Sequence, residues 1–481
     1  MIDLFLKRFF SFYLILLSSV LLIADGNQMP NVVIVFNDDM GYGDLGCYGA
    51  TAIHTPRVDN LATEGMKFTD FYMASSVCSA SRAALLTGCY PLRVGVPGVF
   101  FPNRGDQGLD PEHITIAEIL KTAGYNTKAV GKWHLGDHPK YLPTNQGFDS
   151  YYGIPYSNDM TPAENMKYAD DCLFREEITI EKLEQAFALA KEKKGKASKV
   201  MKDKVPLMYN EECIEFPVDQ KTITQRFATE GIHFITESVK EEKPFFLYLA
   251  NSMPHTPLFA SSEFLGKSKR GLYGDVIEEI DYNTGRILDH LDDLKIADNT
   301  IVIFTSDNGP WLIKGKNGGS ALPLFEGKTT HFEGGHRVPA IIRWPKRIPA
   351  NSVCREVALS MDIFPTLAHI VGADMPTDMI RDGKNILNLW TVEGEKSPHE
   401  FFFFGKYAVR SGPWKYHHKE VYKVKSTARL AKGPTLYNLE KDLGESTNLI
   451  ESYPEIASRL SQALMNNPNK KISKKSNQNS K

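Results

Sequence analysis

The chain has 481 residues, 42% of them hydrophobic and 24% charged, which is typical of a soluble globular protein with a large core. Its 56 basic and 58 acidic residues give a net charge of −2, so no overall field favours nucleic acid, and none is expected as a partner. Six cysteines are too few for a disulfide scaffold. These figures exclude a disordered chain, a collagen, a coiled coil and a polytopic membrane protein.

The first residues have the pattern of an export signal. Lys7 and Arg8 precede an apolar run over 9–23, and a small-x-small cleavage site follows at 24–26. The run is shorter than the roughly 20 residues that a membrane span needs. We expect residues 1–26 to be a signal peptide. The mature protein would then be periplasmic or extracellular (lysosomal in a eukaryote), and not an integral membrane protein.

Buried strands and helices alternate along the chain. Continuous apolar runs typical of strands buried on both faces lie at 31–36, 244–250 and 300–305. Helical periodicity is found at 114–123, 179–194 and 275–294. This alternation predicts an α/β fold with a doubly wound sheet and an active site at the carboxyl ends of the strands.

The pattern changes after about residue 395. Short alternating segments near Phe401, Tyr407 and Trp414 are separated by Gly and Pro turns, which predicts a small antiparallel β-sheet. Residues 466–481 are rich in Lys, Asn and Ser and are expected to be a disordered basic tail. We therefore divide the chain into a catalytic domain at 27–394, a β-rich subdomain at 395–465 and the tail.

Two acidic clusters directly follow predicted strands. Asp38 and Asp39 come after the first strand, and Asp307 and Asn308 come after the strand at 300–305. Three carboxylates and an amide brought together would repel each other unless a cation joined them, and their hard oxygens suit Ca²⁺ or Mg²⁺. The alternative is that each pair only caps a turn or a helix.

Cys78 precedes a helix-favouring segment that contains Arg82. A helix N-terminus stabilises an anion, and an arginine provides a bidentate donor for a phosphate-type or sulfate-type oxyanion. Cys78 is thus a candidate nucleophile, although most lone cysteines are inert core residues.

Further candidates lie at Lys132, His134, His255 and Lys328. If 131–136 is extended, Lys132 and His134 point to the same side and could hold an anion and move a proton. The alternative is an ordinary half-buried strand. His255 lies in a proline-bracketed loop beyond a strand end, and Lys328 follows Gly327. His336 and Arg337 are assigned to packing or ion pairs.

Together these residues describe a site for a compact tetrahedral oxyanion. The cationic side would comprise Arg82, Lys132, His134, His255 and Lys328. The acidic side would hold a divalent cation. Hydrolysis of a sulfate or phosphate ester follows, and the residue types alone do not choose between the two esters.

The ordered motifs resemble those of the type I sulfatases. The signature over 78–88, CSASRAALLTG, is similar to the family's C-x-P-S-R-x-x-L-L-T-G, with Ala80 in place of the usual proline. Agreement continues at 38–44, 131–136, 254–257, 306–309 and 333–339, and 436–445 extends it towards the C-terminus. Residues 153–159 look like the arylsulfatase A and N-acetylgalactosamine-6-sulfatase branch.

The resemblance implies an alkaline-phosphatase-like mixed sheet sandwiched by helices, and a role for each site residue. A formylglycine-generating or sulfatase-maturing enzyme would oxidise Cys78 to formylglycine, whose hydrate is the nucleophile. The implied roles of the others are Ca²⁺ binding (Asp38, Asp39, Asp307, Asn308), orientation of the hydrate (Arg82), sulfate binding (Lys132, Ser157, Lys328), protonation of the leaving alcohol (His255 or Lys328) and proton abstraction (His134).

The resemblance implies hydrolysis of an aryl or carbohydrate sulfate. Relatives with the same nucleophile hydrolyse phosphonate monoesters or phosphodiesters, and this activity is the enzymatic alternative. A catalytically silent protein that binds sulfated glycans is the alternative from another class. The motifs do not choose among sulfated polysaccharides, glycosaminoglycan fragments, sulfolipids and small aryl sulfates.

Overall fold

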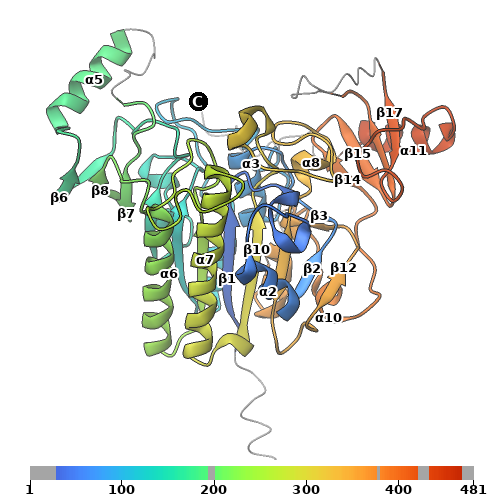
Figure 1. Ribbon diagram of the computed structural model, residues 1–481, viewed down its shortest axis with the longest axis horizontal. Coiled ribbons are helices and arrows are strands. Elements are labelled where there is room, and N and C mark those ends of the chain that lie inside the picture. The colour runs from blue at the N-terminus through green and yellow to red at the C-terminus, as the bar shows by residue number, and fades with distance from the viewer. Residues whose placement is uncertain (1–28, 193–200, 376–379, 421–432, 468–481) are drawn as a thin grey trace, which may run out of the picture.

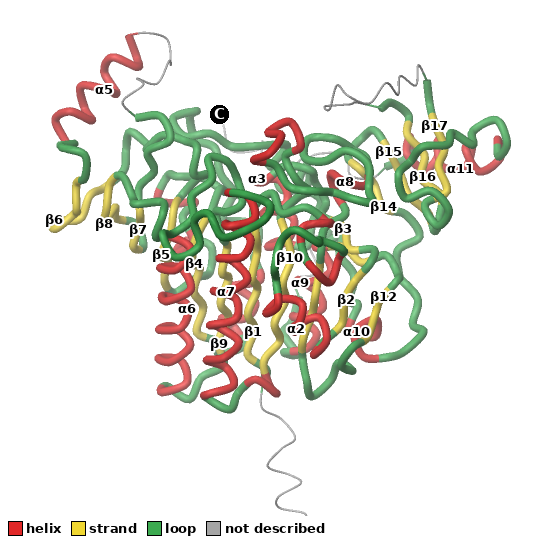
Figure 2. The backbone as a smooth tube through the Cα atoms, viewed as in Figure 1, coloured by secondary structure: helices red, strands yellow, loops and turns green. Residues whose placement is uncertain are grey.

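The computed structural model describes residues 29–192, 201–375, 380–420 and 433–467. The predicted signal peptide and most of the predicted tail lie outside these ranges. A large mixed sheet of eleven strands forms the centre of the molecule (Figures 1 and 2). Its strand order is β12 (Ser352–Cys354), β2 (Met66–Phe68), β11 (Ala340–Arg343), β10 (Thr300–Ser306), β1 (Asn31–Asn37), β9 (Phe245–Ala250), β4 (Asn126–Lys132), β5 (Ser150–Ile154), β7 (Leu207–Tyr209), β8 (Glu212–Phe216) and β6 (Lys167–Phe174).

The five central strands, from β10 to β5, are parallel, whereas β11 and β7 are antiparallel to their neighbours. The register brings the strand ends level, with Asn37 opposite Ser306 and Phe36 opposite Ala250. Residues that follow these strands in the sequence therefore meet at one edge of the sheet. The strands predicted at 31–36, 244–250 and 300–305 are confirmed.

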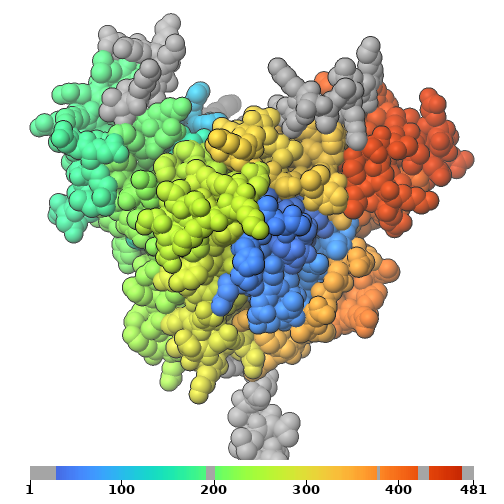
Figure 3. Space-filling view, in the orientation of Figure 1, coloured from blue at the N-terminus to red at the C-terminus, as the bar shows by residue number. Residues whose placement is uncertain are grey.

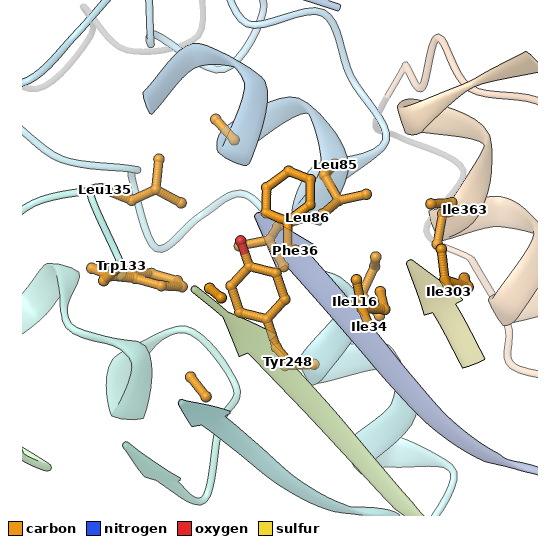
Figure 4. Close-up of a cluster of buried hydrophobic side chains, with 14 of the residues drawn as sticks. Ile34, Phe36, Leu85, Leu86, Ile116, Trp133, Leu135, Tyr248, Ile303 and Ile363 are labelled. Atoms are coloured by element: carbon orange, nitrogen blue, oxygen red, sulfur yellow. The ribbon is translucent and has the colours of Figure 1, made fainter. Parts of the chain in front are cut away.

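Alternate residues of β1 point to the two faces of the sheet, and each face is covered by helices. Val33 and Val35 pack against helices α2 (Pro56–Glu64), α6 (Ile223–Lys240) and α7 (Leu272–Asp293). Ile34 and Phe36 face α3 (Cys78–Thr87), α4 (Ile116–Thr122) and α9 (Ile363–Ile370), as Figure 4 shows for Leu85 and Ile116. The helices predicted at 114–123 and 275–294 are confirmed as α4 and α7.

Beyond β5 the sheet continues into an arm formed by β7, β8 and β6, from which helix α5 (Ile180–Glu192) projects (Figure 1). This helix confirms the amphipathic segment predicted at 179–194 over the part that is described. Figure 3 shows the arm and the C-terminal part of the chain at opposite ends of the molecule. Among the described residues, no helix is long and apolar enough to span a membrane.

The C-terminal part forms a separate antiparallel sheet, as predicted. Its strands are β14 (Phe402–Phe404), β15 (Ala408–Ser411), β16 (Trp414–His417) and β17 (Thr435–Asn438). Helix α11 (Pro454–Met465) packs on β15 and β16. Other short elements are β3 (Phe71–Tyr72), which pairs with β13 (Ala358–Leu359), and helices α8 (Glu333–His336) and α10 (Leu387–Thr391). Short 3-10 helices lie at Tyr42–Asp44, Gly46–Tyr48, Pro139–Tyr141, Pro143–Asn145, Ala297–Asn299, Leu312–Asn317 and Ser360–Asp362. The domain boundary at 394/395 stays a prediction.

One local prediction is wrong. Strand β4 ends at Lys132, and His134 has a left-handed backbone with φ of 64°. Lys132 and His134 therefore do not share a face of one extended strand, because the backbone turns between them.

Candidate active site

The predicted site residues lie together at the carboxyl edge of the sheet. Asp38 and Asp39 follow β1, and Asp307 follows β10. The amide of Asp39 donates to Asp307 Oδ1 at 3.2 Å, which ties the two loops together. Asn308 Nδ2 donates to Asp39 Oδ1 at 2.7 Å, and all four side chains are buried. The two acidic clusters thus form one group.

Each carboxylate of this group forms a close ion pair with a cation from another segment of the chain. The shortest contacts are Lys132 Nζ to Asp38 Oδ2 at 2.5 Å, Lys328 Nζ to Asp39 Oδ1 at 2.6 Å, and Arg82 Nη2 to Asp307 Oδ2 at 2.8 Å. Buried charges persist only when they are paired in this way. The acidic and cationic side chains predicted from the sequence are therefore paired with each other in one group and do not form two separate sides of the site.

The three carboxyl groups do not ionise with equal ease. Burial works to raise the pKa of Asp38, but Lys132 and Arg82 hold it well below its ordinary value. Burial, with the charge of Asp38 added, raises the pKa of Asp39 and raises that of Asp307 to about 7. More positive charge is needed to keep all three ionised, and a divalent cation would supply it.

Two buried oxygens of the group also suit a metal. Asp39 Oδ2 and Asn308 Oδ1 are buried without a hydrogen-bond partner among the described residues. Ligand atoms of Asp38, Asp39, Cys78 and Asp307 lie within 4.8 Å of one another. Carboxylate and amide oxygens are the ligands that Ca²⁺ and Mg²⁺ prefer, so the donor set fits either ion.

Cys78 is the first residue of α3, as predicted, and its thiol is at the centre of the group. Its Sγ lies 3.5 Å from Asp38 Oδ1 and 3.2 Å from Lys328 Nζ. The position at a helix N-terminus does not make this thiol acidic. Burial outweighs the nearby lysines and raises the pKa of the Cys78 thiol. The neutral thiol is therefore favoured.

Arg82 lies one helical turn after Cys78, and its guanidinium is completely buried. Its Nε and Nη2 both donate to Asp307 Oδ2, at 3.1 and 2.8 Å, and Nη1 donates to the carbonyl of Lys132 at 2.9 Å. The guanidinium also stacks 5.3 Å from the centre of the Phe36 ring. These contacts fix Arg82 at the floor of the site and join α3 to β1, β4 and β10.

His134 has one free ring nitrogen. Its Nε2 lies 3.0 Å from the carbonyl oxygen of Phe100, and because a carbonyl only accepts, Nε2 carries the proton. Nδ1 is buried and has no hydrogen-bond partner among the described residues. Burial, followed by the charges of Lys132 and Arg82, lowers the pKa of His134 well below its ordinary value. His134 is therefore neutral and can accept a proton at Nδ1.

His255 is oriented by Asn158. Nδ2 of Asn158 donates to the carbonyl of Pro257 at 2.8 Å, so its Oδ1 faces His255 Nδ1 at 3.1 Å and accepts from it. Ser157 Oγ also lies 3.2 Å from Nδ1. Nε2 is thereby directed towards Asp39 Oδ2 at 3.8 Å. Burial, with Lys328 beside it, lowers the pKa of His255 well below its ordinary value.

Every residue predicted for the site is therefore brought to one place, but the sequence reasoning missed Asn158 and Trp311. Trp311 packs on His255, with ring centres 5.3 Å apart, and its ring centre lies 4.7 Å from Lys328 Nζ. Asn158 lies within the motif at 153–159, and Trp311 lies two residues after the motif at 306–309, which was the available signal. His336 and Arg337 lie outside the site, as predicted, in contact with the Met73 carbonyl and Asp70 respectively.

Comparison with known proteins identifies the family. The chain is 37% identical to arylsulfatase A of Homo sapiens over 460 residues, which covers 90% of this chain and 86% of that protein. It is 39% identical to N-acetylgalactosamine-6-sulfatase of Canis lupus familiaris over 410 residues, covering 82% and 72% of the two chains. The crystal structure of Ps i-CgsB in complex with k-i-k-neocarrahexaose superimposes with a TM-score of 0.73 at 30% identity, over 91% and 92% of the chains.

Solved structures of a sulfatase and of a phosphonate monoester hydrolase superimpose on this chain and confirm the predicted alkaline-phosphatase-like fold. A model described as "N-sulphoglucosamine sulphohydrolase, C-terminal" matches residues 324–470. The model of the sulfatase family matches residues 30–373, which include every residue predicted for the site. The chain belongs to the sulfatase family and is a sulfuric ester hydrolase.

Proposed function

We propose that the chain hydrolyses an aryl or carbohydrate sulfate to an alcohol and inorganic sulfate, using a formylglycine made from Cys78 beside a bound Ca²⁺. The observation that carries the proposal is the position of Cys78 Sγ. It lies 3.2 Å from Lys328 Nζ and 3.5 Å from Asp38 Oδ1, in the group that also holds Arg82 and Lys132. Such a group binds a compact oxyanion and stabilises the charge that develops on it.

The protonation state of Cys78 supports its conversion. A thiol whose pKa is raised by burial is a weak nucleophile near neutral pH. Oxidation to formylglycine by a formylglycine-generating or sulfatase-maturing enzyme would supply a hydrated aldehyde, whose hydroxyl is the nucleophile. Arg82 is fixed one turn away on the same helix and would orient that hydroxyl.

The metal ligands would be Asp38, Asp39, Asp307 and Asn308. The two unpartnered oxygens, Asp39 Oδ2 and Asn308 Oδ1, support this assignment. Bound Ca²⁺, or Mg²⁺ in its place, would neutralise the carboxylates and withdraw charge from a sulfate oxygen.

Three residues would bind the sulfate itself. Lys132 brings an ammonium group to Asp38, Lys328 brings one to Asp39, and Ser157 brings a hydroxyl. All three side chains are buried, which strengthens their attraction for an anion because little water screens it.

Proton transfer would involve residues on two sides of the site. His134 would accept a proton at its free Nδ1 when the sulfate departs. Lys328 or His255, on the Asp39 side, would protonate the oxygen of the leaving alcohol. Both of the proton-transfer roles that a two-step displacement requires are thus filled by this chain's own residues.

The names of the similar proteins support a ring-shaped substrate. They include an arylsulfatase, an N-acetylgalactosamine-6-sulfatase and a structure that holds an oligosaccharide. We extend this to an aryl or sugar sulfate for the present chain. The sequence pattern at 1–26 supports export, so the substrate would be met in the periplasm, outside the cell or in a lysosome.

Two measurements test the proposal. Mass spectrometry of the peptide containing Cys78, from protein made in its native host, should show an aldehyde in place of the thiol. The purified protein should hydrolyse 4-nitrophenyl sulfate faster than 4-nitrophenyl phosphate, and Cys78→Ala should abolish this turnover while the unfolding temperature stays unchanged. An intact thiol, or turnover that survives in Cys78→Ala, would refute the mechanism.

A further inference from the structure

The side chains of the site differ slightly in their exposure to solvent. Arg82 and Lys132 are 0% exposed and form the floor, whereas His255 and Lys328 are 4% and 6% exposed. Trp311 packs against both of these more exposed residues and is itself only half-buried. Trp311 therefore lies on the less deeply buried side of the site, and we take this side as its opening.

Trp311 is held in place by the loops of the site. It comes three residues after Asn308, and the amide of Lys328 donates to the Pro310 carbonyl at 2.9 Å. On its other side, Arg270 donates to the carbonyls of Lys316 and Gly318 at 2.9 and 2.8 Å. These bonds hold the backbone on both sides of the short 3-10 helix over Leu312–Asn317, and with it the segment that carries Trp311.

A charged side chain lies over the same indole. The ammonium of Lys314 is 4.0 Å from the centre of the Trp311 ring, and Lys314 is exposed to solvent. The opening thus presents a flat apolar ring beside a positive charge. Aromatic rings pack against aryl rings and against the C–H faces of sugars, and an exposed lysine pairs with sulfate or carboxylate groups.

We propose that Trp311 and Lys314 form the binding site for the leaving group, and that they select a ring-shaped alcohol carrying a second anionic group, such as a polysulfated sugar. This inference rests on the proposed function, since it assumes that the scissile sulfate lies on the floor. The ring that bears the ester then has to pass the indole, and Lys314 reaches an anionic substituent on that ring. Trp311 and Lys314 would determine specificity and take no part in bond breaking.

Binding of intact substrate separates this inference from the proposed function, because it requires no turnover. Full-length Cys78→Ala is titrated calorimetrically, in the presence of Ca²⁺, with inorganic sulfate, a monosulfated monosaccharide and a disulfated monosaccharide. Adding Trp311→Ala should weaken binding of both sugars roughly tenfold, whereas Trp311→Phe should weaken it less. The affinity for inorganic sulfate should change less than twofold in both variants.

Lys314→Gln should reduce the preference for the disulfated over the monosulfated sugar, and the nearby exposed Lys316→Gln is the matched control and should not. The inference is overturned if Trp311→Ala leaves the affinity for both sugars unchanged. It is also overturned if Trp311→Ala weakens the binding of inorganic sulfate as much as that of the sugars, since the indole would then only position Lys328 and His255. It is also overturned if Lys314→Gln and Lys316→Gln behave alike. A wild-type protein that binds these sugars but hydrolyses no sulfate ester would refute the proposed function alone.

Discussion

Lys415 of the C-terminal sheet and Glu333 of the main domain form a completely buried ion pair, with Nζ and Oε1 2.9 Å apart. Glu333 begins α8, five residues after Lys328, and its amide donates to Glu445 Oε2 at 2.7 Å. Lys415 also contacts Glu445 at 3.1 Å. The C-terminal sheet thereby anchors the loop that carries Lys328 into the active site.

Replacing Lys415 by Met should therefore destabilise the protein strongly. The change removes the ammonium group that both Glu333 and Glu445 contact, and although Arg337 stays 3.3 Å from Glu333, breaking a buried pair costs roughly 3–5 kcal/mol of unfolding free energy. Urea unfolding would measure the loss. Lys441→Met, at an exposed position of the same subdomain, is the control and should cost less than 1 kcal/mol. Equal effects of the two variants would contradict this account.

The same pair predicts how stability depends on pH. Burial works to raise the pKa of Glu333, but Lys415 and Arg337 hold it well below its ordinary value of 4.5. A carboxyl group with a lowered folded pKa stabilises the fold above its unfolded pKa, and this contribution is lost as the pH falls below it. Glu333→Gln has no such dependence. The stability gap between wild type and Glu333→Gln should therefore be widest near pH 7 and narrow below about pH 4.5, measured by unfolding at several pH values.

The sequence predicted the parts of the site that depend on short segments. Asp38 and Asp307 could be placed together because each directly follows an apolar run, and parallel strands end at the same edge. Cys78 could be placed at a helix start because residues 81–86 favour a helix. These inferences need only local patterns and the general rule for doubly wound sheets.

Contacts between distant segments could not be predicted in this way. The pairing of Lys415 with Glu333 depends on how the C-terminal sheet packs against the segment that carries Glu333, and no periodicity encodes it. The positive φ of His134 breaks the strand pattern at a residue that the alternation rule treats as extended. The raised pKa of Cys78 reflects burial from all sides, which outweighs the helix N-terminus that the sequence indicates.

Removal of the metal should abolish turnover and lower stability together. The chelator EGTA should lower the unfolding temperature of the protein, and Ca²⁺ at about 100 times its dissociation constant should restore roughly 2.7 kcal/mol. Asp307→Asn should bind Ca²⁺ more weakly by calorimetry, because one carboxylate is lost, whereas the exposed Asp293→Asn should bind it normally. Full stability and turnover after exhaustive chelation would argue against a metal.

His134→Gln should distinguish the structural role of Nε2 of His134 from the proton-accepting role of Nδ1. The Gln amide can still donate to the Phe100 carbonyl, but it lacks the acceptor that Nδ1 provides. We expect kcat to fall about 10²- to 10⁴-fold, as for loss of a general base, with little change in unfolding temperature. His134→Asn is the complementary variant, because it loses the hydrogen bond to the Phe100 carbonyl that the Gln variant keeps. It should therefore lose stability as well as activity. A Gln variant with normal kcat would exclude His134 as the base.

Lys328, and not His255, should be the residue that protonates the leaving alcohol. Burial opposes the charge of Lys328, but Asp39 raises its pKa above the ordinary value, so it carries a proton, whereas the surroundings of His255 keep that ring neutral. Loss of a general acid matters most when the leaving group is poor. Lys328→Ala should therefore reduce kcat/KM for a sugar sulfate at least about 100-fold more than for 4-nitrophenyl sulfate. His255→Ala should reduce both by the same factor, and the reverse pattern would assign the proton to His255.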